Sequence, residues 1–189
     1  IKIGSIDSNT INENIVSIFA KQTDNIFKSV NDIYDLKSCI GDDSCNQHLL
    51  IASSNKLIMC KDILLNITES NGKWHRSIAI AEISSMIRAA ANDIIGITIT
   101  VDIGDDVLKI INACDNISEI SITIAISESL GAPGSSVNIF NQSANKLEAA
   151  AQCLQAITNA MADSTIAGLI SQTVNKICDV NLDLTQLFN

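Results

Sequence analysis

The chain has 189 residues with 12 basic and 21 acidic side chains, a formal net charge of −9, and its residues are 47% apolar and 17% charged. This apolar content excludes a disordered tail or linker protein, because there is enough apolar surface to form a core. The acidic balance argues against non-specific binding to nucleic acid, whose affinity comes from Lys and Arg on phosphates. The length fits one domain over residues 1–189 without a separate linker.

Long helices are the elements that the sequence predicts most clearly. Pro133 is the only proline and there are eight glycines, so the usual breakers of secondary structure are scarce. Between these breakers, apolar residues recur at spacings of three, four and seven, which is the period of an amphipathic helix. The first predicted helix covers about residues 11–40, with a capping box over residues 10–13 and Gly41 just past its end.

Five further helices follow in chain order. The second comes after the turn over residues 41–44 and stops at residues 71–72, and the third contains Ile80 to Ile94 and closes near Gly104. The fourth begins at Asp105 or Asp106 and ends in the breaker over residues 130–134. The fifth begins at Ser135 or Ser136 and carries apolar residues as far as Met161, and the sixth begins near Ser164. The alternating tail over residues 180–188 is left without an assignment.

The predicted fold is therefore an all-α, disulfide-braced bundle of five or six long amphipathic helices. Two stretches leave an α+β alternative open. Residues 95–103 and 120–126 alternate apolar and polar side chains and are rich in Ile and Thr, which favours short strands. Both stretches also continue helical stripes without an intervening turn, and this continuity favours the bundle.

Cysteines and glycosylation motifs indicate the compartment. Six cysteines, an even number, accompany three Asn-X-Ser/Thr sequons at Asn66, Asn116 and Asn141, and the chain begins at Ile1 rather than Met. Together these signals predict a secreted, extracellular glycoprotein with up to three disulfides. The candidate disulfide cysteines are Cys39, Cys45, Cys60, Cys114, Cys153 and Cys178, with a local Cys39–Cys45 bridge as the one pairing that the spacing favours.

No pattern of catalytic or metal-binding residues is evident. The histidines His48 and His75 belong to no zinc motif, the cysteines include no C-x-x-C pair, and the G-x-S-x-G motif of many serine hydrolases is missing. Paired acids beside turns, as at Asp105 and Asp106, are explained by helix capping. The sequence thus predicts a non-enzymatic protein without a metal or a cofactor. It also predicts no membrane-spanning helix, since no apolar run approaches 18 residues.

An aliphatic interior is the strongest functional indication. The chain contains 34 isoleucines and 14 leucines against six aromatic residues, which are the side chains that usually fill large core spaces. We therefore expect either a well-packed core or a cavity that encloses a fatty acid, a sterol or a similar lipid-like molecule. The expected wall residues are Ile80, Ile83, Ile87, Ile94, Ile110, Ile120, Ile124, Leu154 and Ile157.

Two other functions remain open at this stage. Isoleucine-rich amphipathic helices also suit an extracellular structural or surface-active protein that assembles with copies of itself. The third alternative is a secreted effector or inhibitor of another protein, which needs an exposed patch that the sequence does not locate.

Overall fold

A computed structural model describes residues 45–67, 72–126, 133–158 and 160–188. Over these ranges the chain forms five α-helices and a final 3-10 turn, and contains no strand. The elements are α2 (Cys45–Asn66), α3 (Gly72–Ile95), α4 (Gly104–Ile126), α5 (Pro133–Gln155), α6 (Asp163–Thr185) and η2 (Gln186–Phe188). The prediction of an all-α bundle is confirmed for this part of the chain. The predicted helix over residues 11–40 lies outside it.

Several helix boundaries differ from the prediction. Helix α3 ends at Ile95 rather than near Gly104, and α5 ends at Gln155 rather than near Met161. Helix α5 begins at Pro133, which the sequence analysis had placed in a breaker, because proline suits the first turn, where its missing N–H would have no helical partner. Helix α6 continues through the alternating tail to Thr185. Periodicity therefore located the helices well and their ends less well.

The two alternating stretches have different structures, and neither is a strand. Residues 120–126 form the last two turns of α4. Residues 96–103, which we call the strap, join α3 to α4 without helix or strand. In the strap Ile97 is buried, Ile99 and Ile103 are half-buried against the core, and Thr98 and Thr100 are exposed. The strap's alternation thus reflects a non-helical segment lying on the bundle, without a partner strand.

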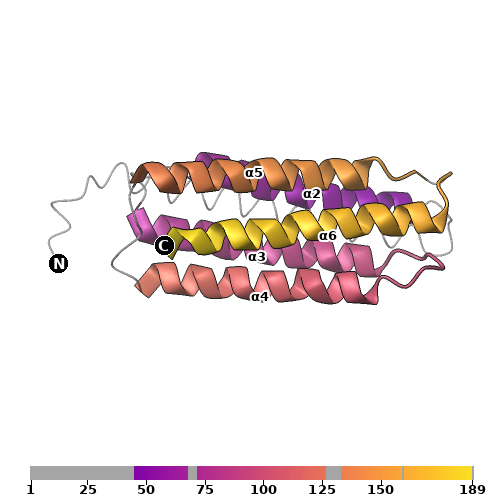
Figure 1. Cartoon of the computed structure of the whole chain (residues 1–189), viewed down its shortest axis with the longest axis horizontal. Helices are drawn as coiled ribbons and strands as arrows, with labels where there is room; N and C mark the ends of the chain where they lie inside the picture. The colour runs from indigo at the N-terminus through magenta and orange to yellow at the C-terminus, as the bar shows by residue number, and fades with distance from the viewer. Residues whose placement is uncertain (1–44, 68–71, 127–132, 159, 189) are drawn as a thin grey trace, which may run out of the picture.

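The five helices form a ring. Helix α2 packs against α3, α3 against α4, α4 against α6, α6 against α5, and α5 against α2. In Figure 1, α5 and α6 lie in front, α2 and α3 lie behind them, and α4 runs along one edge. In a regular ring of five helices at the usual spacing of about 8–10 Å, each helix axis lies roughly 7–8.5 Å from a central line. Side chains alone occupy the middle of such a ring.

The direction of the helices makes one neighbouring pair parallel. Successive helices run up and down along the long axis of the molecule (Figure 1), so an odd-numbered ring must contain one parallel pair. That pair is α4 and α6, and both begin at the end of the bundle where the strap lies. Side-by-side helix N-termini carry partial positive charges, and Asp105, Asp106 and Asp163 in the first turns compensate these charges.

None of the described helices combines the length and the apolar character needed to cross a bilayer.

Candidate functional site

A single apolar cluster extends through the ring and receives side chains from every described α-helix. The nine residues that the sequence analysis expects to line an apolar interior all belong to this cluster. Ile80, Ile83, Ile87 and Ile94 come from α3, Ile110, Ile120 and Ile124 from α4, Leu154 from α5, and Ile157 from the segment just after α5. Ile120 is 7% exposed and the other eight are fully buried. Their burial is therefore established, and ligand contact stays a prediction.

The sequence analysis left two helices out of the expected wall. Helix α2 contributes Leu57, Cys60 and Leu64, and α6 contributes a longer stripe, all of them buried. The α6 stripe consists of Ile166, Ile170, Val174, Ile177, Val180 and Leu184. The same three- and four-residue spacing that marked α3 and α4 could have found these residues. The interior thus has five aliphatic sides rather than three.

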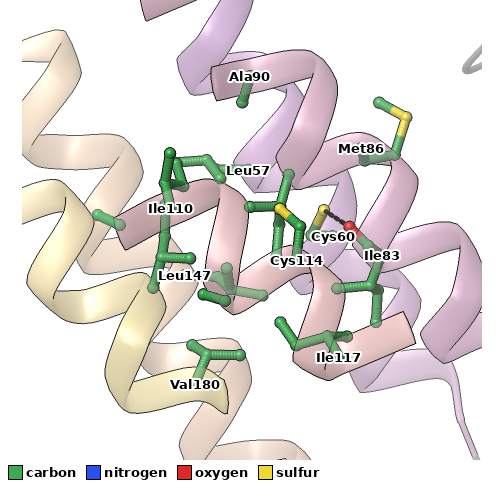
Figure 2. Packing of buried hydrophobic residues seen from close by; sticks show 14 of the residues in the cluster. Leu57, Cys60, Ile83, Met86, Ala90, Ile110, Cys114, Ile117, Leu147 and Val180 are labelled. Atoms are coloured by element: carbon green, nitrogen blue, oxygen red, sulfur yellow. Dashed lines mark hydrogen bonds between the residues drawn. The ribbon is translucent and has the colours of Figure 1, made fainter. Parts of the chain in front are cut away.

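Figure 2 shows side chains from all five helices pointing toward one another. Leu57 and Cys60 come from α2, Ile83 from α3, Cys114 and Ile117 from α4, Leu147 from α5 and Val180 from α6. Phe140 is the one aromatic member of the described core cluster. At the level drawn in Figure 2, the contacts are therefore aliphatic groups and sulfur atoms.

The cysteines correct the prediction of a disulfide-braced bundle. Cys60, Cys114, Cys153 and Cys178 are free thiols, one on each of α2, α4, α5 and α6. The Cys60 thiol donates a hydrogen bond to the Ile83 carbonyl, with Sγ and O 3.7 Å apart. An even cysteine number carries no information on distance, and here the helical stripes bury thiols as small apolar side chains. Cys39 and the side chain of Cys45 lie outside the described residues, so their predicted bridge stays a prediction.

Burial keeps the central thiols protonated. Loss of solvation raises the pKa of Cys60 well above its ordinary value and raises the pKa of Cys114 to about 12. The nearby Arg88 opposes the shift at Cys114 without cancelling it. At neutral pH the two thiols are therefore uncharged and contribute to an apolar interior, not to a nucleophilic site.

We call the line of contact between two neighbouring helices a seam. Side-chain hydroxyl groups form hydrogen bonds across several of these seams. Ser77 Oγ donates to the Ser121 carbonyl at 2.8 Å, and Ser121 Oγ donates to the Ser77 carbonyl at 3.0 Å, which joins α3 to α4. Ser54 Oγ donates to the Ala151 carbonyl at 3.2 Å across the α2–α5 seam. Thr173 Oγ1 donates to the Ala150 carbonyl at 3.4 Å across the α5–α6 seam. These buried hydroxyls have partners within the seams.

Ion pairs cross three seams, two of which also contain the hydroxyl bonds just described. Lys56 and Asp93 join α2 to α3, Lys146 and Asp183 join α5 to α6 at 2.6 Å, and Arg88 pairs with Asp115 between α3 and α4. Over the described residues, no hydrogen bond or ion pair joins α4 to α6. Among the described residues, the α4–α6 seam is therefore the one that neither a hydrogen bond nor an ion pair crosses.

The strap end of the bundle carries acidic side chains. Asp102 Oδ1 accepts a hydrogen bond from the Gly104 backbone N–H at 2.8 Å and so caps α4, where the sequence analysis had favoured Asp105 or Asp106 as the cap. Asp105, Asp106 and Asp163 follow in the first turns of α4 and α6. This end is therefore unfavourable for an anionic group.

The three sequon asparagines are exposed. Asn66 is the last residue of α2, and its side-chain amide donates to the Asp62 carbonyl at 2.7 Å. Asn116 lies on α4 and Asn141 on α5. Glycosylation and secretion stay predictions, which a mass shift after treatment with a glycosidase would test.

Comparisons of the chain with protein-family models, with curated proteins and with solved structures found no match. Among the described residues, His, Cys, Asp and Glu side chains form no group of three that could hold a metal ion.

Proposed function

We propose that the protein is a binding protein or carrier that encloses an aliphatic molecule between the five described helices. The observation that supports this proposal is the ring itself. The helices pack around a central line, and the side chains that meet inside it are aliphatic and thiol groups from all five (Figure 2). When side chains inside the ring move aside, contacts between them are replaced by contacts between these side chains and the aliphatic ligand.

The energetics favour a long aliphatic chain. Each methylene that leaves water for an apolar interior gains roughly 0.8 kcal/mol. Ten methylenes therefore gain roughly 8 kcal/mol, which offsets the several kcal/mol lost when the ligand gives up its free motion. The seams closed by hydroxyls and ion pairs keep four of the five helix pairs in register while side chains inside the ring rearrange.

Charge selects among aliphatic ligands. The chain has a net charge of −9, and Asp102, Asp105, Asp106 and Asp163 gather at the strap end. A carboxylate head group would meet electrostatic repulsion there. An uncharged head, as in a long-chain alcohol or a sterol, is therefore favoured over the anion of a fatty acid.

Two measurements test ligand binding. Organic extraction of the purified protein followed by mass spectrometry should yield a lipid-like molecule. The delipidated protein should then bind N-phenyl-1-naphthylamine, a neutral probe that fluoresces in apolar surroundings, and 1-hexadecanol should displace the probe more effectively than palmitate. An empty extract with no probe binding and no shift in melting temperature would contradict the proposal.

A matched pair of variants locates the binding site. Cys114→Phe adds a phenyl group where side chains from all five helices meet, and it should weaken probe binding at least tenfold. Ile122→Phe adds the same phenyl group on the same helix, where Ile122 is 60% exposed, and should leave probe binding unchanged. Equal affinity of the two variants for the probe would mean that the probe binds outside the ring of helices.

Self-association is a second candidate, favoured by the outer face of α4. Leu108, Ile122 and Ile126 lie on one side of this helix and are 57%, 60% and 74% exposed. Apolar side chains at these exposures lose contact with water when copies of the chain pack together. Analytical ultracentrifugation of the wild type against Ile122→Asp, from low to high concentration, tests this candidate. A wild-type protein that stays monomeric throughout would exclude it.

A further inference from the structure

The strap takes a longer path than the connection between α3 and α4 requires. These helices are antiparallel neighbours, which a few residues could join. The strap instead bonds to α2 through Thr98 and to α6 through Thr100 before it reaches α4. Since α2 and α6 stand on either side of the α3–α4 pair in the ring, this route carries the strap across the end of the ring.

Two side-chain clamps hold the strap in place. The Asn46 amide donates to the Thr98 carbonyl at 2.8 Å and accepts from the Thr98 backbone N–H at 2.9 Å. Asp163 Oδ2 accepts from the Thr100 backbone N–H at 2.8 Å and from Thr100 Oγ1 at 2.7 Å. All four bonds lie at the exposed surface, where water competes for the same groups. The clamps are therefore specific in geometry and easily opened.

The strap also closes the end of the apolar interior. Ile97 is 6% exposed and belongs to the core cluster, and Ile99 and Ile103 pack against that cluster. At Gly96 the strap leaves α3 so close to α2 that an added Cβ would lie 3.2 Å from Leu49 Cδ1. Displacing the strap would therefore open a direct route to aliphatic side chains.

The seam beside the strap is the one without a polar connection. Over the described residues, no hydrogen bond or ion pair joins α4 to α6, whereas each of the other four seams has a hydrogen bond or an ion pair. The clamp between Thr100 and Asp163 is thus the polar link between the start of α6 and the segment that leads into α4. Releasing it frees both the strap and the first turns of the parallel pair.

We propose that the strap, residues 96–103, is the gate through which an uncharged aliphatic ligand reaches the interior, and that it opens by release of the Asn46 and Asp163 clamps. This inference rests on the proposed function. It adds the place of access, the moving segment and the two residues that control the rate. Because the gate is closed in the free and in the bound protein alike, weakening it changes rates without changing affinity.

The test measures the kinetics of N-phenyl-1-naphthylamine binding by stopped-flow fluorescence, with the full delipidated chain. The double variant Asn46→Ala, Asp163→Ala should raise both the association and the dissociation rate at least fivefold and leave Kd within twofold of wild type. The control Asn66→Ala removes an exposed side-chain hydrogen bond of similar length at the end of α2, and it should keep wild-type rates. Circular dichroism spectra and melting temperatures show that each variant is folded.

A locked variant provides the opposite perturbation. Thr100→Cys with Asp163→Cys places one thiol on each side of this clamp, where the native Thr100 Oγ1 and Asp163 Oδ2 are 2.7 Å apart. Once oxidised and checked by peptide mapping, this protein should bind the probe at least tenfold more slowly, and reduction should restore the rate. The reduced protein serves as its own control.

The outcomes separate the gate from the proposed function. Probe binding by the wild type, with unchanged rates in the double variant and in the locked protein, would overturn the gate and leave the binding function standing. A change in Kd without a change in association rate would make the clamps part of a binding site and would also overturn the gate. If the wild type binds neither the probe nor 1-hexadecanol, the function and the gate fail together.

Discussion

Lys56 Nζ lies 2.5 Å from Asp93 Oδ2, and the two side chains are only 5% and 9% exposed. The pair joins the middle of α2 to the last turn of α3. Removing one partner from a buried ion pair leaves the other charge in a medium that solvates it poorly. The pair therefore fixes how α2 and α3 pack more than it adds to net stability.

We expect Lys56→Met to lower the free energy of unfolding by about 3–5 kcal/mol. Asp93→Leu should have an effect of similar size, and the double variant should lose clearly less than the two single losses added together. Urea denaturation followed by circular dichroism measures all three. Strict additivity would mean that the two charges do not interact in solution.

The loss of unfolding free energy on shortening an isoleucine to alanine should increase with the burial of that isoleucine. Ile117 is fully buried and Ile122, five residues later on α4, is 60% exposed. Ile117→Ala should cost about 2–5 kcal/mol, because the missing groups leave a space that the ring fills only in part. Ile122→Ala should cost no more than about 0.5 kcal/mol. Similar losses for the two variants would mean that α4 faces the core with a different side.

The Ile117→Ala variant also allows ligand binding to be tested through its effect on stability. If apolar ligands occupy the ring, N-phenyl-1-naphthylamine should recover part of the stability that Ile117→Ala loses, since a ligand that binds only the folded state stabilises it. The melting temperature of this variant should therefore rise more with the probe than that of Ile122→Ala.

The helical stripes and the apolar interior could be predicted from sequence because both depend on local spacing. Residues three and four apart lie on the same face of a helix, so Ile80, Ile83 and Ile87 are buried together once α3 forms. The same rule misjudged the end of α3. Ile97 and Ile99 continue an apolar pattern, but they belong to the strap, whose path depends on Asn46 and Asp163 far away in the chain.

The predicted disulfides failed for a related reason. A cysteine on an apolar stripe follows the same spacing as an isoleucine, so Cys60 and Cys114 fit the core whether or not they are bonded. Pairing depends on the distance between helices and on the cellular compartment, and periodicity reports neither. The order of the helices around the ring could not be predicted from periodicity either, since it arises from contacts between helices that are distant in sequence, such as α2 and α5.

The buried thiols should make stability depend on alkaline pH. Their pKa values are raised in the folded protein, to about 12 for Cys114, from an ordinary value of 9.0. The unfolded chain therefore releases these protons first as the pH rises. The stability that the neutral thiols provide is complete below pH 9 and is lost progressively between pH 9 and about 12. In Cys60→Ala with Cys114→Ala, unfolding measured against pH should show a shallower decline over this window.

Accessibility of the thiols checks the same structure at neutral pH. Cys153 and Cys178 are half-buried, whereas Cys60 and Cys114 are fully buried. Iodoacetamide followed by peptide mapping should modify Cys60 and Cys114 only after denaturation, and Cys153 and Cys178 earlier. Rapid labelling of Cys114 in the native protein would contradict the burial on which its high pKa depends.

The clamp at Asp163 should weaken in acid. Hydrogen bonds from the Thr100 hydroxyl and backbone N–H lower the pKa of Asp163 below its ordinary value of 3.8, so these bonds stabilise the closed strap when the carboxylate is ionised. That stabilisation is complete above the pKa of the open state and is lost as the pH falls through the lowered pKa of the closed state. Amide exchange at Thr100, followed by NMR, should therefore gain protection with rising pH through this range once corrected for the intrinsic exchange rate. Asp163→Asn should remove this step, while Asp102→Asn, a change within the strap two residues from Thr100, should leave it in place. A step that persists in Asp163→Asn would assign the titration to a different group.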